Sequence, residues 1–289
     1  MAVAVEFIQP TTWEEALAAK SGVPGSVPIA GGTDVMVDLN FDRARPDALL
    51  DLTRVRDLRE WGEDDGMLRI GAGVSYTRVI AELGDRLPGL AMAARTIGSP
   101  QIRNRGTVGG NLGAASPAGD SHPPLMAVRA DVELASTRGL RRVPVRDFYA
   151  GPKQNVVADD ELIAAILIAP ATGAEQFSKI GTRNAMVIAA CSFALAIDPV
   201  ARRVGTGIGS AGPTPLAARE AETFLEGVLG DRDGWEAPVP LGEAAVERFC
   251  ELVAAAARPI DDVRSSAAYR REALRVLARR TLTWALGAA

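Results

Sequence analysis

Two short segments combine glycines with small polar side chains, the residue types that let a backbone approach a ligand closely. The first, AGGTD, places two adjacent glycines before Thr33 and Asp34; the second, TVGGN, runs from Thr107 to Asn111. Glycine has no Cβ and tolerates positive φ, and successive amides in such a turn can bind an anion. Both segments are therefore predicted to bind phosphate, and together they could clasp the two ends of a dinucleotide. For AGGTD, a tight turn without function remains the alternative, because Gly-Gly turns are common.

The second segment belongs to a longer stretch, residues 102–120, with almost no hydrophobic periodicity. We expect a loop here. Long loops flanked by apolar segments are more often functional than disordered. Asp120 closes the stretch and is a candidate acceptor for sugar hydroxyl groups.

Two further features have more than one interpretation. GIGSAG, residues 207–212, matches a dinucleotide fingerprint, but Pro215 would fall in the first turns of the following helix. We interpret it as a structural connection, since a lone fingerprint is weak evidence. His122 is the single histidine. It could shuttle a proton or bond a ribose, or it could be an ordinary packed residue.

Composition limits the class of protein. The 289 residues are 47% apolar and 24% charged, so the chain can bury a core and form two or three subdomains. A net charge of −4 argues against a general nucleic-acid binder. Cys191 and Cys250 form no metal-binding pattern and fit a reducing cytoplasm. The apolar run that begins at Val187 is too short to span a membrane, and no signal peptide is visible. We expect no metal site, no membrane span and a cytoplasmic location.

The elements that must position these segments follow from periodicity, caps and breakers. A helix over 11–20 has Thr12 and Glu15 spaced as a capping box, and a second helix starts after Ser75. Residues 175–198 form two strands, or a strand and a helix. Strands are expected within 3–10, 27–35, 47–52, 67–74, 161–170 and 202–212, and a short helix followed by a strand within 123–136. Closing helices are expected from about Pro215, Gly242 and Ala267. With a boundary near 171–174, strands followed by helices indicate an α+β fold.

The order of five sequence elements resembles the FAD-binding medium subunit of molybdenum hydroxylases, which include carbon monoxide and xanthine dehydrogenases. These elements are AGGTD, IGSPQIRNRGTVGGNLGAASPAGDSHPPLMAVRADVEL, DELIAAILI, FSKIGTRNAMVIA and DDVRSSAAYRREAL, and the resemblance covers nearly the whole chain. It implies a vanillyl-alcohol-oxidase-type FAD-binding domain over residues 1–172, with α/β subdomains of roughly 1–55 and 56–172. A C-terminal domain over 173–289 would hold a small antiparallel sheet plus helices.

The resemblance also implies which residues contact FAD. Arg103 and Asn104 belong to the motif without an assigned contact. The implied contacts are Ala30, Gly31, Gly32, Thr33, Asp34 and Val35 in the first loop, Thr107, Val108, Gly109, Gly110 and Asn111 in the second, and Ile97, Ser116, Asp120, Ile163 and Lys179 elsewhere.

A member of this family is an oxidoreductase subunit that relays electrons. The resemblance implies a large subunit with the molybdenum cofactor and a small subunit with two-iron two-sulfur clusters, assembled as a dimer of heterotrimers. Electrons would pass through FAD to an external acceptor. No catalytic acid–base residue is expected in this chain, because the protein holds and tunes the flavin.

Two other functions compete with the electron relay. One is a self-contained flavin oxidase of the vanillyl-alcohol oxidase superfamily, in which His122 would be the only histidine able to link the flavin covalently. The short C-terminal region argues against it. The other is a non-catalytic scaffold, which would have no need of two glycine-rich phosphate loops.

Overall fold

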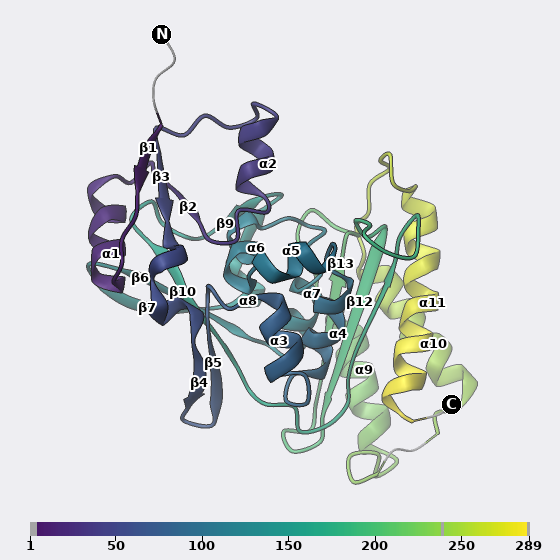
Figure 1. The fold of residues 1–289 in the computed structure, drawn as a ribbon. Helices are drawn as coiled ribbons and strands as arrows, with labels where there is room; N and C mark the ends of the chain where they lie inside the picture. The colour runs from purple at the N-terminus through teal and green to yellow at the C-terminus, as the bar shows by residue number, and fades with distance from the viewer. Residues whose placement is uncertain (1–4, 238–239, 288–289) are drawn as a thin grey trace.

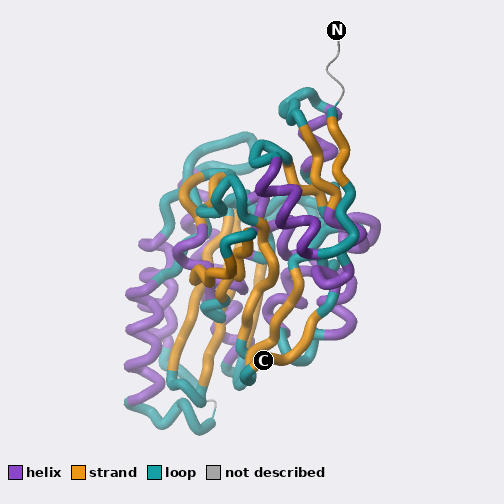
Figure 2. Tube along the Cα trace, turned by 90° about the vertical axis from the view of Figure 1, so that its left-hand side faces the viewer, coloured by secondary structure: helices purple, strands orange, loops and turns teal. Residues whose placement is uncertain are grey.

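Three larger sheets, a two-stranded hairpin and their covering helices make up the described residues, 5–237 and 240–287, of the structure, a computed structural model (Figure 1). Both views place the small first sheet at the end of the molecule where the chain begins (Figures 1 and 2). Helices α10 and α11 lie on the opposite side from α1 (Figure 1). Within the described residues, no helix combines the length and hydropathy that crossing a bilayer requires.

The first sheet is parallel, in the order β1-β3-β2. Its elements are β1 (Glu6–Ile8), α1 (Trp13–Gly22), β2 (Val27–Ile29), α2 (Val35–Asn40) and β3 (Ala48–Asp51), followed by the 3-10 turns Leu52–Arg54 and Arg56–Arg59. The predicted capping box of α1 is confirmed: the Glu15 amide donates to Thr12 Oγ1 at 3.2 Å, and the Thr12 amide donates to Glu15 Oε2 at 3.3 Å. Residues 3 and 4 of the predicted first strand lie outside the described residues.

The second sheet is antiparallel, in the order β4-β5-β10-β6-β7. Its strands are β4 (Trp61–Asp64), β5 (Met67–Gly71), β6 (Asp131–Ser136), β7 (Gly139–Pro144) and β10 (Leu162–Ile168). The β-branched apolar run of β10 is central and buried on both faces, as predicted. Around this sheet lie α3 (Tyr76–Glu82), α4 (Pro88–Thr96), α5 (Pro100–Arg105), α6 (Val108–Ala114), α7 (His122–Ala127), α8 (Val145–Phe148) and the hairpin of β8 (Tyr149–Gly151) and β9 (Gln154–Asn155).

The expectation of a loop over residues 102–120 is wrong for most of the stretch, because α5 and α6 occupy residues 100–105 and 108–114. The Ser99 and Thr107 side chains cap the two helices. Glycine costs a helix about 1 kcal/mol each, and burial of Val108 and Leu112 in the core offsets that cost. Those two residues, four apart, carry the whole helical pattern, and the glycines around them hide it.

The third sheet is antiparallel, in the order β11-β12-β13, so residues 175–198 form two strands rather than a strand and a helix. Its elements are β11 (Glu175–Ile180), β12 (Cys191–Asp198), β13 (Arg203–Gly209), α9 (Arg219–Gly230), α10 (Glu243–Ala256) and α11 (Ala267–Ala285). Residues of α9–α11 form one core cluster with this sheet. On the other side, Phe177 and Ala194 pack with Ala93 of α4 and Ala127 of α7. The third sheet is therefore buried between two groups of helices.

Helix α7 lies with its backbone directly against β13. A Cβ on Gly205 would lie 1.8 Å from the carbonyl oxygen of Ala127, and one on Gly207 would lie 1.9 Å from that of Pro123. No side chain fits at either position. Gly207, the first glycine of the 207–212 fingerprint, therefore serves packing, which agrees with the interpretation as a structural connection. The following helix, α9, begins only at Arg219, beyond Pro215.

Helix α4 is held at both ends by β11. Glu175 Oε2 accepts a hydrogen bond from the Gly89 amide at 3.0 Å, and Lys179 Nζ donates to the carbonyl oxygen of Thr96 at 3.2 Å. The four residue steps along β11 from Glu175 to Lys179 together span about 13 Å, and so does the nine-residue helix α4. The acidic group meets the positive end of the helix dipole and the basic group meets the negative end, so charge and length both fix this docking.

Replacing Gly207 with alanine is expected to lower the free energy of unfolding by ~3 kcal/mol, because its methyl group would overlap the α7 backbone. The measurement is chemical denaturation followed by circular dichroism. Gly227→Ala is the control, since a Cβ there meets nothing within 4 Å. It should stabilise α9 by about 1 kcal/mol. Equal effects of the two substitutions would contradict the packing role.

Burial raises the pKa of Glu175 from 4.5 to about 7, against the opposing effect of the Gly89 amide. The folded protein then binds this proton more tightly than the unfolded chain does. The free energy of unfolding should therefore fall as pH rises from 4.5 to about 7, by roughly 3 kcal/mol. The slope should be shallower in Glu175→Gln, compared by denaturation across that pH range. Identical slopes in the two proteins would contradict the assignment.

Candidate functional site

The two glycine-rich segments touch each other in the structure. A Cβ on Gly31 would lie 2.0 Å from the carbonyl oxygen of Arg105, and one on Gly106 would lie 3.7 Å from Thr33 Oγ1. The turn after β2 therefore packs against the connection between α5 and α6. Gly31 is required for this approach, because any side chain there would push the two segments apart.

The first segment offers a run of unpaired donors. Among the described residues, none accepts a hydrogen bond from the amides of Gly31, Gly32, Thr33 or Asp34. Gly32 has a φ of +77°, which favours glycine. The Asp34 side chain makes no cap bond to α2. Successive free amides are the donors that an anion-binding nest requires.

The second segment differs from the predicted nest, because three of its amides are used within the chain. Gly109 donates to Ala72 O at 3.1 Å, Gly110 to Thr107 Oγ1 at 2.9 Å, and Asn111 to Thr107 O at 3.0 Å. A Cβ on Gly109 would lie 2.4 Å from Ala72 Cβ, so this glycine serves packing. Val108 is fully buried in the core. Gly110 is exposed, with only Thr107 Oγ1 at 3.0 Å from its Cβ position.

Asn111 is oriented by a short chain of hydroxyl groups. Ser121 Oγ donates to Asn111 Oδ1 at 2.7 Å, and Tyr76 donates its hydroxyl to Ser121 Oγ at 3.0 Å. Tyr76 is almost fully buried, and burial raises its pKa, so the phenol keeps its proton. Oδ1 is thus occupied, and no residue in the described part of the chain accepts from the amino group of Asn111, which leaves it as a donor.

Asp120, in the turn before α7, forms a buried ion pair with Lys179 of β11. Lys179 Nζ lies 2.5 Å from Asp120 Oδ2, and Thr96 Oγ1 donates to the same oxygen at 3.1 Å. Both charged side chains are 8% exposed. Burial raises the pKa of Asp120 and the charge of Lys179 opposes that shift. Within the described residues Asp120 Oδ1 has no partner, so one acceptor remains for a hydroxyl group.

The motif residues without an assigned contact hold the turn at Ile97. Arg103 Nη1 donates to the carbonyl oxygens of Ile97 and Gly98, at 3.0 and 3.1 Å. Asn104 Oδ1 accepts from Thr77 Oγ1 at 2.6 Å, tying α5 to α3. These contacts fix the end of α4, where half-buried Ile97 lies.

The other predicted contacts lie around these segments. Ala30 and Val35 flank the unpaired amides and are half-buried. Ser116 Oγ accepts from the Ala118 amide at 3.3 Å and so shapes the turn before Asp120. Ile163 lies at a bulge in β10, and its Cδ1 is 3.8 Å from the Cβ position of Gly113, at the end of α6.

His122 is a packed residue rather than a proton shuttle. Its ring is fully buried, and Nδ1 lies 2.7 Å from the hydroxyl of Tyr149. Burial lowers the pKa of His122 to about 3, so the ring stays neutral at neutral pH. A Cβ on Gly119 would lie 2.3 Å from His122 Nε2, which explains the glycine there. In the described part of the chain, no group of three or more His, Cys, Asp or Glu residues is arranged to hold a metal ion.

Lys153 is a candidate site residue that sequence reasoning missed. It lies in the β8–β9 turn with a φ of +57°, and its amide donates to Ala115 O at 3.1 Å, just past α6. Burial raises the pKa of Asp34, and the charge of Lys153 opposes this shift. A cation therefore lies near the first segment. No pattern in the sequence marks it, because a single lysine in a turn has no characteristic spacing.

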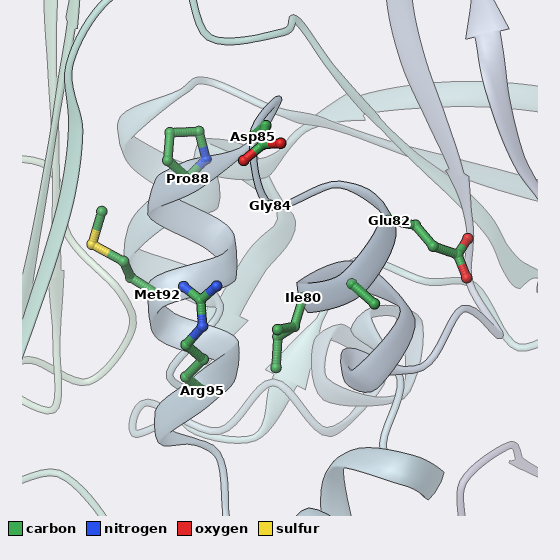
Figure 3. Close-up of a pocket in the computed structure, with 8 residues that line it drawn as sticks. Ile80, Glu82, Gly84, Asp85, Pro88, Met92 and Arg95 are labelled. Carbon is green, nitrogen blue, oxygen red and sulfur yellow. The ribbon is translucent and has the colours of Figure 1, made fainter.

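A surface hollow of about 260 Å³ lies between α3 and α4, away from the glycine-rich segments. Figure 3 shows the Arg95 and Met92 side chains of α4 and Ile80 of α3 at this gap. None of the predicted site residues lines it. The chemistry of the free amides, rather than the size of this hollow, identifies the candidate site.

Comparisons with known proteins match both halves of the chain to described families. Residues 3–171 match the FAD binding domain in molybdopterin dehydrogenase, and residues 176–285 match the CO dehydrogenase flavoprotein C-terminal domain. The nicotinate dehydrogenase FAD-subunit of Eubacterium barkeri is 32% identical over 250 residues, covering 82% of this chain and 84% of that protein.

Two further similarities extend over more of the chain. The putative xanthine dehydrogenase FAD-binding subunit of Escherichia coli K12 is 30% identical over 271 residues, covering 90% of this chain and 89% of that protein. A chain of carbon monoxide dehydrogenase from Hydrogenophaga pseudoflava superposes with a TM-score of 0.89 at 26% identity, covering 100% of both chains.

The two adjacent glycines of α6 should respond differently to alanine. Gly109→Ala should lower the free energy of unfolding by ~2 kcal/mol or more, because its Cβ would overlap Ala72. Gly110→Ala should change it by less than about 1 kcal/mol, since exposed alanine favours a helix. Urea denaturation of both variants checks this. Equal losses would mean that both glycines are needed for packing.

Proposed function

This chain belongs to the FAD-binding family of molybdopterin dehydrogenases, and from that membership we propose how it holds the flavin and what it assembles with. It is an FAD-binding oxidoreductase subunit of the molybdenum hydroxylase type. FAD contains a pyrophosphate, a ribose and a ribityl chain, so its protein site needs amide donors and hydroxyl acceptors.

The run of free amides at Gly31–Asp34 is the observation that carries the proposal. It supports pyrophosphate binding there, and Lys153 adds positive charge beside it. Exposed Gly110 leaves the main chain of α6 open, and the free amino group of Asn111 adds a donor. The unpaired oxygen of Asp120 fits a sugar or ribityl hydroxyl. The proposed contacts are Ala30, Gly31, Gly32, Thr33, Asp34, Val35, Ile97, Thr107, Val108, Gly109, Gly110, Asn111, Ser116, Asp120, Ile163 and Lys179.

The residues of this chain bind and orient the cofactor. When bound, FAD supplies the reversible electron chemistry that links iron–sulfur clusters to an external acceptor. Gly109 and Val108 fix α6 through the core, so contacts from these two residues would come from the main chain. Neutral His122 and protonated Tyr76 exchange no protons near neutral pH. A fully buried His122, bonded to Tyr149, gives no support to a covalent flavin link.

We extend the proposal to domains and partners. A division into residues 1–172 and 173–289 is supported by the family matches, which end at residue 171 and resume at 176. A parallel sheet beside an antiparallel sheet supports the two-subdomain, vanillyl-alcohol-oxidase-type arrangement. Relatives named as FAD-subunit and medium chain support assembly with other subunits. We propose that these are a molybdenum-cofactor subunit and an iron–sulfur subunit, in a dimer of heterotrimers.

Titration of FAD into the flavin-free protein should quench flavin fluorescence and give a yellow complex. Gly110→Leu should weaken FAD binding at least about ten-fold, because the side chain fills the open approach to α6. Its free energy of unfolding should stay within about 1 kcal/mol of the parent value.

Unfolding releases flavin that is bound without a covalent link, so acid precipitation of the complex should leave FAD in the supernatant. Flavin that remains with the pellet would support a covalent link instead. A folded protein that neither binds FAD nor becomes yellow would overturn the proposed function.

A further inference from the structure

Arg270 of α11 lies in the C-terminal motif, outside the proposed FAD contacts, yet it is 2% exposed. Removing a guanidinium group from water costs several kcal/mol unless its donors are well paired. The partners of Arg270 therefore show what this buried charge holds in place.

One end of the guanidinium is anchored to a rigid turn. Arg270 Nη2 lies 2.5 Å from Asp262 Oδ1. The same carboxylate accepts from Arg264 Nε at 3.0 Å and from the Ser265 amide at 3.2 Å. Asp262 and Ser265 also pair through their main chains. These bonds fix Asp262, so they fix the guanidinium plane as well.

The other end reaches the main chain after β13. Arg270 Nη1 donates to the carbonyl oxygen of Ser210. The Ser210 amide in turn donates to the carbonyl oxygen of Pro117 at 2.8 Å. Ser210 has a φ of +58°, and within the described residues its buried hydroxyl has no partner. The connection from α11 to Pro117 thus runs through the backbone of Ser210 and not through its side chain.

We propose that Arg270 is a positioning residue for the FAD site. Pro117 lies between Ser116 and Asp120, so fixing its carbonyl fixes the turn that carries both side chains. Arginine suits this task, because its planar fork holds Ser210 and Asp262 in one geometry. The inference rests on the proposed function, which assigns Ser116 and Asp120 to FAD.

The test measures FAD affinity in full-length Arg270→Met and Arg270→Lys by fluorescence titration of flavin-free protein. Arg270→Met loses both bonds and should raise the FAD dissociation constant about ten-fold. Arg270→Lys keeps the charge but not the fork, and should raise it by a smaller factor, about three-fold. The absorption band of bound flavin should shift in both variants, and thermal unfolding of flavin-free protein reports stability separately.

Ser210→Gly is the matched control, because it keeps both main-chain bonds and removes the positive-φ strain. Its FAD dissociation constant should stay within about two-fold of the parent value, and its melting temperature should not fall. A weakened affinity in Ser210→Gly would overturn the main-chain route.

The outcomes separate this inference from the proposed function. If the parent protein does not bind FAD, the proposed function fails. If the parent binds FAD and folded Arg270→Met binds it equally well, the positioning role is overturned, even when the melting temperature falls. If Arg270→Met does not fold, Arg270→Lys decides: weaker binding supports the role, and unchanged affinity overturns it.

Discussion

The close contact between the α7 backbone and β13 is the constraint on which the candidate site depends. Gly205 and Gly207 leave no room for a Cβ against the carbonyl oxygens of Ala127 and Pro123. Helix α7 starts two residues after Asp120, so the same contact sets where that carboxylate lies. It also brings the third sheet close enough for Lys179 to reach Asp120. The candidate site, whose residues come mostly from the first half of the chain, thus receives Lys179 from the second half.

Buried charges act along the same junction. Asp120 pairs with Lys179, and Glu222 of α9 lies 2.7 Å from Arg146 Nη2, which precedes β8. Breaking a buried pair by removing one partner costs about 3–5 kcal/mol, although the intact pair adds little net stability. Such pairs therefore determine the relative orientation of the docked surfaces more than they add to the free energy of unfolding. The side chains of Glu175 and Lys179 also fix this docking, through hydrogen bonds to the main chain at the two ends of α4.

The two glycine-rich segments look equivalent as sequence, but they serve different physical purposes. In AGGTD the amides stay free and one glycine admits the backbone of Arg105. In TVGGN the amides donate hydrogen bonds to acceptors within the chain, and Gly109 packs against Ala72. Gly110 stays exposed, and Ser121 orients the Asn111 side chain. The first segment is therefore better suited to bind an anion, and the second is better suited to orient a bound group.

The sequence by itself determined the features that depend on near neighbours. The capping box of Thr12 and Glu15, the cap at Ser75, the buried strand β10 and the three closing helices were all predicted correctly. Motif order also identified the family. The tertiary structure alone decided that residues 108–114 are helical, that His122 is packed, and that Lys153 lies near Asp34. The reason is physical: caps and periodicity act within a few residues. Whether an amide is left without a partner, or whether a Cβ fits, depends on elements that are distant in the sequence.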